Sequence, residues 1–180
     1  MGKRKIILNI AISLDGYIAD TDGGFAWIHG DEDKSHDTEK QFSYSEFLES
    51  IDVIIMGRNA YLDCPAETLE SFQSKKIYVA TSHNIENKTD NIKLIKGDVC
   101  TQILELRQKK GKAIWLFGGA GLTDPFIKAD IVDEYIIGII PTILGKGRPL
   151  FLENNPTIKL HLEELTVTEG ITITRYTKKF

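Results

Sequence analysis

Three glycines fall within four positions of the segment LFGGAGL, between an apolar run and a stretch typical of a helix. Glycine lets a backbone approach a phosphate closely, and a helix N-terminus offers unpaired N–H donors and the positive end of the helix dipole. The spacing G-G-x-G is neither the dinucleotide fingerprint nor a P-loop. Gly118, Gly119 and Gly121 therefore predict an anion site, with a tight turn that merely requires glycine as the alternative.

Two further segments place polar groups directly after apolar strands. In DVIIMGRNAY the strand ends at Gly57, and Arg58 and Asn59 open a predicted helix. Arg58 offers a charge-assisted bond to a phosphate, unless it is a solvated surface arginine. In YVATSH the hydroxyls of Thr81 and Ser82 follow a strand end, where open α/β sheets bind ligands. These hydroxyls would hold a 2′-phosphate or simply cap the next element.

The segment NIAISLDGYIA runs from a strand into the turn signal Asp15–Gly16. Small residues such as Ala11 would let a flat ring lie against the backbone. Asp15 is interpreted either as a turn former or as a carboxylate of the site.

The elements that must position these groups alternate between strands and helices. Five apolar runs predict strands at 5–13, 52–57, 76–82, 113–118 and 132–140, and the first four are continuous, as expected for strands covered on both faces. Helices are predicted at 43–51, 98–111 and 122–130, and the β-rich runs 160–169 and 171–180 predict an antiparallel hairpin. The fold class is therefore α/β, a three-layer αβα arrangement with a mixed, mostly parallel sheet, in one domain over residues 1–180.

Composition restricts the function. The net charge is −4 over 180 residues, so a broad nucleic-acid-binding surface is not expected. No run approaches the ~20 apolar residues of a membrane span, and the start of the chain lacks a signal-peptide cleavage site. Cys64 and Cys100 form no zinc-binding pattern, so no metal is expected, and two reduced thiols predict a cytoplasmic protein.

Four motifs in order, N-x-A-x-S-L-D-G-x-I-A, M-G-R-x-x-Y, F-G-G-x-G-L and P-x-x-L-G-x-G-x-x-L-F, resemble the dihydrofolate-reductase-like superfamily over nearly the whole chain. The resemblance is greatest to the reductase domain of the bifunctional riboflavin-biosynthesis deaminase/reductase and its stand-alone relatives. It implies NADPH lying across the strand ends. The residues that it assigns to the cofactor are Ala11, Ile12, Gly57, Arg58, Asn59, Thr81, Ser82, Gly118, Gly119, Ala120, Gly121 and Leu122.

The substrate stays open, because the chain departs from both enzymes. Trp27 lies where dihydrofolate reductases have a Pro-Trp pair, but no proline precedes it, and Ala60 stands where those enzymes have threonine. Pyrimidine-ribosyl and pterin-like compounds are both retained as substrate classes. The residues predicted to contact substrate are Asn9, Trp27 and Lys146.

The predicted activity is hydride transfer from NADPH to a C=N or C=O carbon of a small molecule. Asp15, Asp31 and Glu32 are the candidate catalytic carboxylates, alone or through an ordered water. The alternative is a non-catalytic module that binds NADPH or a pterin. A homodimer is also predicted, with the C-terminal hairpin pairing along its edge.

Overall fold

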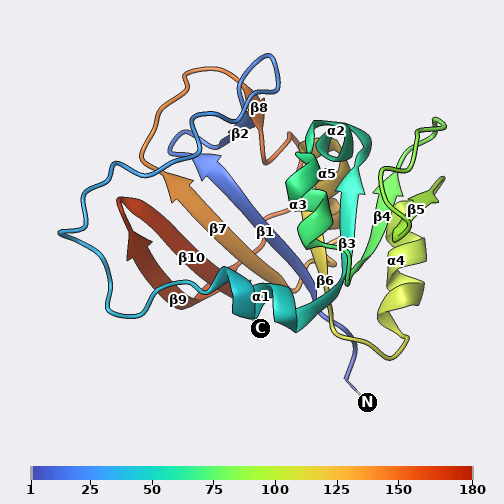
Figure 1. The fold of residues 1–180 in the computed structure, drawn as a ribbon. Helices are drawn as coiled ribbons and strands as arrows, with labels where there is room; N and C mark the ends of the chain where they lie inside the picture. The colour runs from blue at the N-terminus through green and yellow to red at the C-terminus, as the bar shows by residue number, and fades with distance from the viewer. Residues whose placement is uncertain (1, 180) are drawn as a thin grey trace.

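The computed structural model describes residues 2–179, which form an eight-stranded mixed sheet with helices on both faces (Figure 1). The strand order is β5-β4-β3-β6-β1-β7-β10-β9. Six neighbouring strands are parallel, and β10 and β9 complete the sheet in antiparallel pairing. The strands are β1 (Ile6–Ser13), β3 (Ile51–Gly57), β4 (Lys76–Ala80), β5 (Ile92–Ile95), β6 (Ala113–Gly118), β7 (Glu134–Ile140), β9 (Leu160–Thr168) and β10 (Ile171–Lys178).

Five helices in the described part of the chain cover the sheet, and their bounds are α1 (Tyr44–Ser50), α2 (Arg58–Asp63), α3 (Ala66–Ser71), α4 (Val99–Arg107) and α5 (Ala120–Lys128). Alternate residues of the strands contribute to two hydrophobic cores. Leu8, Ile55 and Leu116 pack in one with Ile103 of α4 and Phe126 of α5. The other contains strand residues such as Ile54 together with α1, α2 and α3 side chains. Burial on both faces explains why the strand sequences are continuously apolar.

The predicted three-layer fold with its C-terminal hairpin is confirmed. Glu169 and Gly170 both have positive φ, 49° and 77°, as a two-residue hairpin turn requires. Asp98 caps α4 as predicted, its carboxylate accepting from the N–H of Thr101. Helix α4 ends at Arg107 rather than at 111, and α5 begins at Ala120, directly after the glycines. Strand β5, helix α3 and strand β8 were not predicted.

Two short strands, β2 (Tyr17–Ala19) and β8 (Arg148–Pro149), form a small arm beside the main sheet. The arm touches the glycine turn, since a side chain at Gly119 would meet the δ-methyl of Ile18 at 3.9 Å. After β2 the chain runs without helix or strand until α1, as the long blue segment of Figure 1 shows. This segment, residues 20–43, is called the strap below.

Candidate active site

The glycine motifs of β3 and β6 lie against each other at the carboxyl edge of the sheet. Met56 is paired with Gly118 in the parallel register of these strands. A Cβ on Gly57 would lie 3.5 Å from the carbonyl oxygen of Gly118, and one on Gly118 would lie 3.1 Å from Cδ1 of Ile10. Gly118 also has φ of +125°, which disfavours any side chain. Gly57, Gly118 and Gly119 thus form a backbone surface without side chains, called the glycine cradle below.

Helix α5 begins at this cradle with its first turn uncapped. Gly119 is its N-cap and has no side chain to accept a hydrogen bond. The N–H groups of Leu122 and Thr123 donate to the carbonyl oxygen of Gly119, at 3.0 Å each. The N–H groups before them point from the start of the helix and are suited to an anion.

The register of β3 and β4 brings the other predicted phosphate ligands to the same edge. Gly57 is paired with Ala80, so the residues that follow each strand leave the sheet side by side. Arg58 begins α2 there, and Ser82 is exposed after β4. Thr81 is buried and caps its own turn, its hydroxyl accepting from the N–H of His83 at 3.0 Å.

A single cleft of about 1120 Å³ joins these features. Such a volume exceeds what one drug-sized ligand needs, and it suits a dinucleotide with a second molecule beside it. The predicted residues that line the cleft are Asn9, Ala11, Gly57, Arg58, Asn59, Gly118, Gly119, Ala120, Gly121 and Leu122. Thr81 and Ser82 lie just beyond Ala80, which is itself in the lining.

The far end of the cleft is aromatic. Trp115 and Phe117 of β6 have ring centroids 4.9 Å apart, and Tyr44 of α1 meets Trp115 edge-on at 6.3 Å. Cys64 follows α2 and is buried in the same lining. Burial raises the pKa of both Tyr44 and Cys64, so each stays protonated near neutral pH. Trp115, Phe117, Tyr44, Cys64 and Phe42 are together called the aromatic half.

The three predicted catalytic carboxylates do not line the cleft. Asp15 accepts hydrogen bonds from the Ser13 hydroxyl at 2.7 Å and from the N–H groups of Leu144 and Gly145 at 3.1 and 2.7 Å. It ties the β1–β2 turn to the loop after β7, which corresponds to its interpretation as a turn former. The Ser13 hydrogen bond, followed by those backbone bonds, lowers the pKa of Asp15.

Asp31 and Glu32 lie in the exposed part of the strap, beside the hairpin turn. The N–H of Asp31 donates to the carbonyl oxygen of Glu169 at 2.9 Å, and its carboxylate accepts from the N–H of Asp33. Neither residue is among those that line the cleft. Their acidic spacing reflects an exposed loop anchored to the end of the sheet.

Three other predicted residues also lie outside the lining. Ile12 packs into the core on the α5 side of the sheet. Trp27 turns back on its own loop, its indole N–H donating to the carbonyl oxygen of Gly24 at 3.2 Å. Lys146 is exposed, while its neighbours Gly147 and Arg148 face the cleft. The indole in the cleft is Trp115, whose Nε1–H donates to the carbonyl oxygen of Asn9 at 3.0 Å.

The one acid in the cleft lining is Asp63, at the end of α2. Arg148 also lines the cleft, and it projects from the arm with its guanidinium against Gly23. Helix α2 has Arg58 and Asp63 at its two ends, and both residues line the cleft.

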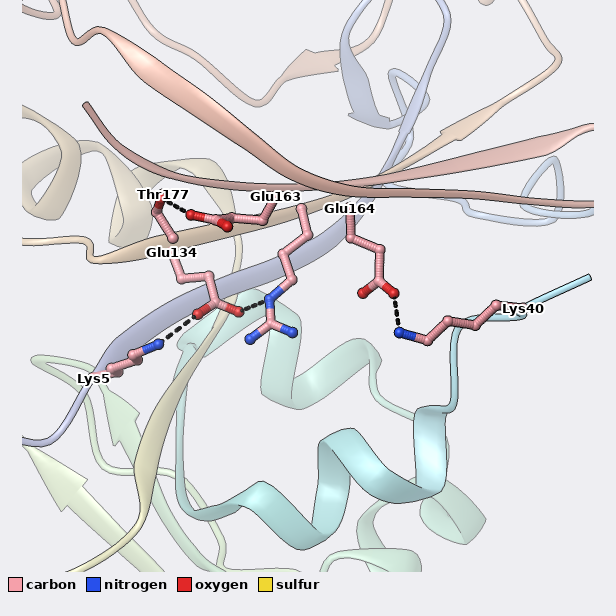
Figure 2. Close-up of a pocket in the computed structure, with 7 residues that line it drawn as sticks. Lys5, Lys40, Glu134, Glu163, Glu164 and Thr177 are labelled. Atoms are coloured by element: carbon pink, nitrogen blue, oxygen red, sulfur yellow. Dashed lines mark hydrogen bonds and ion pairs between the residues drawn. The ribbon is translucent and has the colours of Figure 1, made fainter. Parts of the chain in front are cut away.

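A second cavity, of about 430 Å³, lies over β7, β10 and β9 and is lined mostly by charged side chains (Figure 2). The buried carboxylate of Glu134 receives Lys5 at 3.2 Å and Arg175 at 2.6 Å, and Glu164 pairs with Lys40. These charges neutralise one another, so this cavity is not a comparable ligand site. Within residues 2–179, no group of three or more His, Cys, Asp or Glu side chains is arranged to hold a metal ion.

Within residues 2–179, no helix has the length and apolar character needed to cross a bilayer.

Comparison with known proteins places the fold and the site in context. The family model described as "RibD C-terminal domain" matches residues 4–173. The uncharacterized protein YwjB of Bacillus subtilis (strain 168) is 36% identical over 162 residues, which cover 89% of this chain and 90% of that protein.

Two solved structures share the fold. A putative riboflavin biosynthesis protein from Shewanella sp. PV-4 superposes with a TM-score of 0.79 at 29% identity, covering 98% of this chain and 99% of that one. Dihydrofolate reductase from Enterococcus faecalis, complexed with NADP(H) and RAB-propyl, gives 0.65 at 16% identity over 98% and 97% of the two chains. The latter likeness concerns the fold alone, and it confirms the predicted dihydrofolate-reductase-like architecture.

Proposed function

The chain belongs to the RibD C-terminal domain family, and from that premise we propose that it is an NADPH-dependent oxidoreductase. The reaction proposed is hydride transfer to the carbon of a C=N or C=O bond in a small molecule. The observation that carries the proposal is the glycine cradle, with Arg58 and the uncapped start of α5 beside it and an aromatic half in the same cleft.

The residues present fit this cofactor. The cradle and the first N–H groups of α5 would hold the pyrophosphate, because bare backbone and a helix N-terminus suit an anion. Arg58 and the Thr81–Ser82 turn would recognise the 2′-phosphate, since paired strands bring them to one edge. Ala11 would lie beside the nicotinamide. Bound there, the cofactor supplies the hydride.

The chain's own contribution is alignment, exclusion of water and a proton. Aromatic side chains would exclude water from the half of the cleft where the second molecule would lie. The glycine cradle would hold the cofactor in a fixed position beside that molecule. We assign the proton to the hydroxyl of Tyr44, which is protonated near neutral pH like any tyrosine and which lines this half of the cleft. Replacing Tyr44 with phenylalanine should slow turnover about 100-fold and leave cofactor affinity unchanged.

Equilibrium binding of NADPH and of NADH tests the proposal. The binding would be measured by the quenching of protein fluorescence. Trp115 lines the cleft and Trp27 does not, so Trp115→Phe should remove most of the quenching. Micromolar binding with preference for NADPH is expected, then oxidation of NADPH with members of a carbonyl, imine and pterin panel. Binding without any turnover would favour a non-catalytic NADPH- or pterin-binding module. If neither cofactor bound, the proposed function would be refuted.

We further propose that the protein acts as a homodimer. Leu160, Leu162 and Leu165 of β9 are 37%, 46% and 48% exposed, and the residues opposite them on β10 are Lys178, Tyr176 and Thr174. Directly paired residues share a face, so the three leucines form one stripe, called the leucine stripe below. An exposed apolar stripe at the end of a sheet favours burial against a second copy.

A further inference from the structure

The end of α2 that faces the aromatic half is held by a lysine from outside the cleft. The last carbonyl groups of a helix have no partner within it, and a basic side chain can satisfy them. Here the Lys88 ammonium donates to the carbonyl oxygens of Leu62 at 3.1 Å and of Tyr61 at 3.4 Å. It also donates to the carbonyl oxygen of Cys64, the residue after the helix, at 3.5 Å. Lys88 therefore supports the cleft wall formed by Asp63 and Cys64 without lining the cleft itself.

A buried tyrosine strengthens this attachment. Tyr61 of α2 is fully buried, and its hydroxyl accepts from the backbone N–H of Lys88 at 2.7 Å. The same hydroxyl donates to the carbonyl oxygen of Glu86 at 3.1 Å, and the Lys88 ammonium lies 5.2 Å from the centre of the Tyr61 ring. Both the side chain and the backbone of Lys88 are thus bound to α2, so a movement of residues 86–88 would be transmitted to the helix end.

The segment that contains Lys88 begins at the turn proposed for the 2′-phosphate. It is the connection between β4 and β5, and Thr81 and Ser82 are its first residues. Arg58, the other group proposed for that phosphate, is the first residue of α2. Helix α2 and the connection start from paired strand ends and meet again at the contacts between Tyr61 and Lys88. A phosphate bound by both Arg58 and Ser82 would therefore join them at a second point.

We infer that Lys88 is a positioning residue that couples recognition of the 2′-phosphate to order in the aromatic half of the cleft. The inference rests on the proposed function, because it requires the 2′-phosphate to bind between Arg58 and Ser82. NADP+ would bridge α2 and the connection at one end, and the bridge would strengthen the contacts of Lys88 at the other. NAD+ lacks this phosphate and would leave the far end of α2 as it is in the free protein. A second molecule would then meet a better ordered wall in the NADP+ complex.

Alkylation of Cys64 measures the order of this wall without knowledge of the second molecule. Cys64 is buried, so iodoacetamide reaches its thiol when the helix end opens. Peptide mass spectrometry would follow Cys64 and Cys100 separately, and Cys100 of α4, outside the cleft lining, serves as the internal reference. At saturating concentrations, NADP+ should slow the alkylation of Cys64 about fivefold more than NAD+ does. The two dinucleotides differ only in the phosphate, so direct shielding of the thiol by the cofactor cancels in this comparison.

Substitution of Lys88 tests whether the coupling passes through this residue. Lys88→Met removes the ammonium but keeps the length of the side chain. It should speed the alkylation of Cys64 severalfold in the free protein and abolish the difference between NADP+ and NAD+. Lys88→Arg keeps a charged donor and should restore most of that difference. Lys93→Met is the matched control and should change neither rate, because Lys93 is an exposed lysine of β5 outside the cleft lining and the charge change is identical.

Several outcomes would overturn the inference. These are equal alkylation of Cys64 with both dinucleotides in the wild-type protein, a difference that persists in Lys88→Met, and an equal rise at Cys100 in Lys88→Met. The last would show that Lys88 stabilises the whole fold rather than this end of α2. The fluorescence titrations with NADPH and NADH test the cofactor site separately, so a protein that prefers NADPH but shows no difference at Cys64 would refute only this inference.

Discussion

Arg58 is the residue on which discrimination between NADPH and NADH should depend. It is the cation that directly follows the β3 strand end, at the same edge of the sheet as the Thr81–Ser82 turn, and charge-assisted bonds to a phosphate are stronger than neutral ones. Arg58→Ala should therefore weaken NADPH about tenfold or more and affect NADH much less. Lys146→Ala, which removes an exposed charge outside the cleft lining, should change neither affinity. Equal losses for both cofactors would show that Arg58 does not read the extra phosphate.

Asp15 should affect stability, and its effect should depend on pH. Its pKa is lower in the folded protein than the ordinary value of 3.8, chiefly because of the Ser13 hydrogen bond. The carboxylate therefore stabilises the fold fully above that value, and its contribution disappears as the pH falls through the folded pKa.

Chemical denaturation of Asp15→Asn and wild-type protein between pH 7 and pH 2.5 measures this contribution. The difference in unfolding free energy should be constant at neutral pH and shrink below about pH 4. Asp22→Asn is the control, because its exposed carboxylate accepts no hydrogen bond from the described residues. A difference that persists unchanged at the acid end would mean that the ionised carboxylate is not the stabilising form.

The two aspartates show where residue-level prediction succeeded and failed. The Asp15–Gly16 turn signal was correct, because a turn depends on neighbouring residues alone. The place of Asp63 in the cleft lining could not be predicted from neighbouring residues, because it depends on where α2 ends relative to β6. Similarly, a tryptophan was predicted in the site, but packing across the sheet placed Trp115 there rather than Trp27.

At the level of elements, the start of α5 offers a test in which stability and binding should change in opposite directions. A Cβ at Gly121 would meet no atom within 4 Å, so alanine is accommodated. Alanine in a helix is favoured over glycine by about 0.5–1 kcal/mol. Gly121→Ala should thus stabilise the protein and still weaken NADPH severalfold, because the methyl group enters the space of the pyrophosphate.

Thermal unfolding without cofactor and NADPH titration together measure the two effects of Gly121→Ala. If affinity were retained while stability rose, the phosphates would not lie against this turn. A fall in stability would instead show that the helix start tolerates no side chain, and the binding result would then not bear on the cradle.

The central elements could be predicted because burial on both faces produces a continuous apolar run, which is visible without knowing the neighbours. Strands β1, β3, β4 and β6 are of this kind. Strand β5 has only four residues and lies at the edge of the sheet, with Lys93 exposed, so its pattern is weak. The strap has no periodicity at all, and its role follows only from its contacts with the hairpin.

At the scale of the whole molecule, the strap covers the edge of β9. The N–H of Thr38 donates to the carbonyl oxygen of Val167 at 3.0 Å, and the Thr38 hydroxyl accepts from the N–H of Val167 at the same distance. Asp37 accepts from the N–H of Glu169 at 2.6 Å. This half of the edge is therefore paired within the chain, so a second copy would have to use the face of the hairpin rather than this edge.

The two faces of the hairpin differ in what they offer a second copy. One carries charged residues that form ion pairs, among them Glu164 with Lys40 (Figure 2). Arg175 of the same face pairs with Glu134. The other carries the leucine stripe. The register shifts between Arg175 and Tyr176, so that β9 has one extra residue there, and this shift keeps all three leucines on the same face. Mutual burial of this stripe across a two-fold axis would remove apolar surface from water on both copies.

Leu165→Glu should therefore convert a dimer to a monomer without unfolding it, because the side chain is already 48% exposed. Two glutamates facing each other across the axis would repel, and the apolar contact would be lost. Sedimentation velocity at micromolar concentration measures the change. Leu62→Glu is the matched control, a leucine 40% exposed on α2, and it should leave the dimer intact. A monomeric wild-type protein, or a dimer that survives Leu165→Glu, would show that the leucine stripe is not the interface.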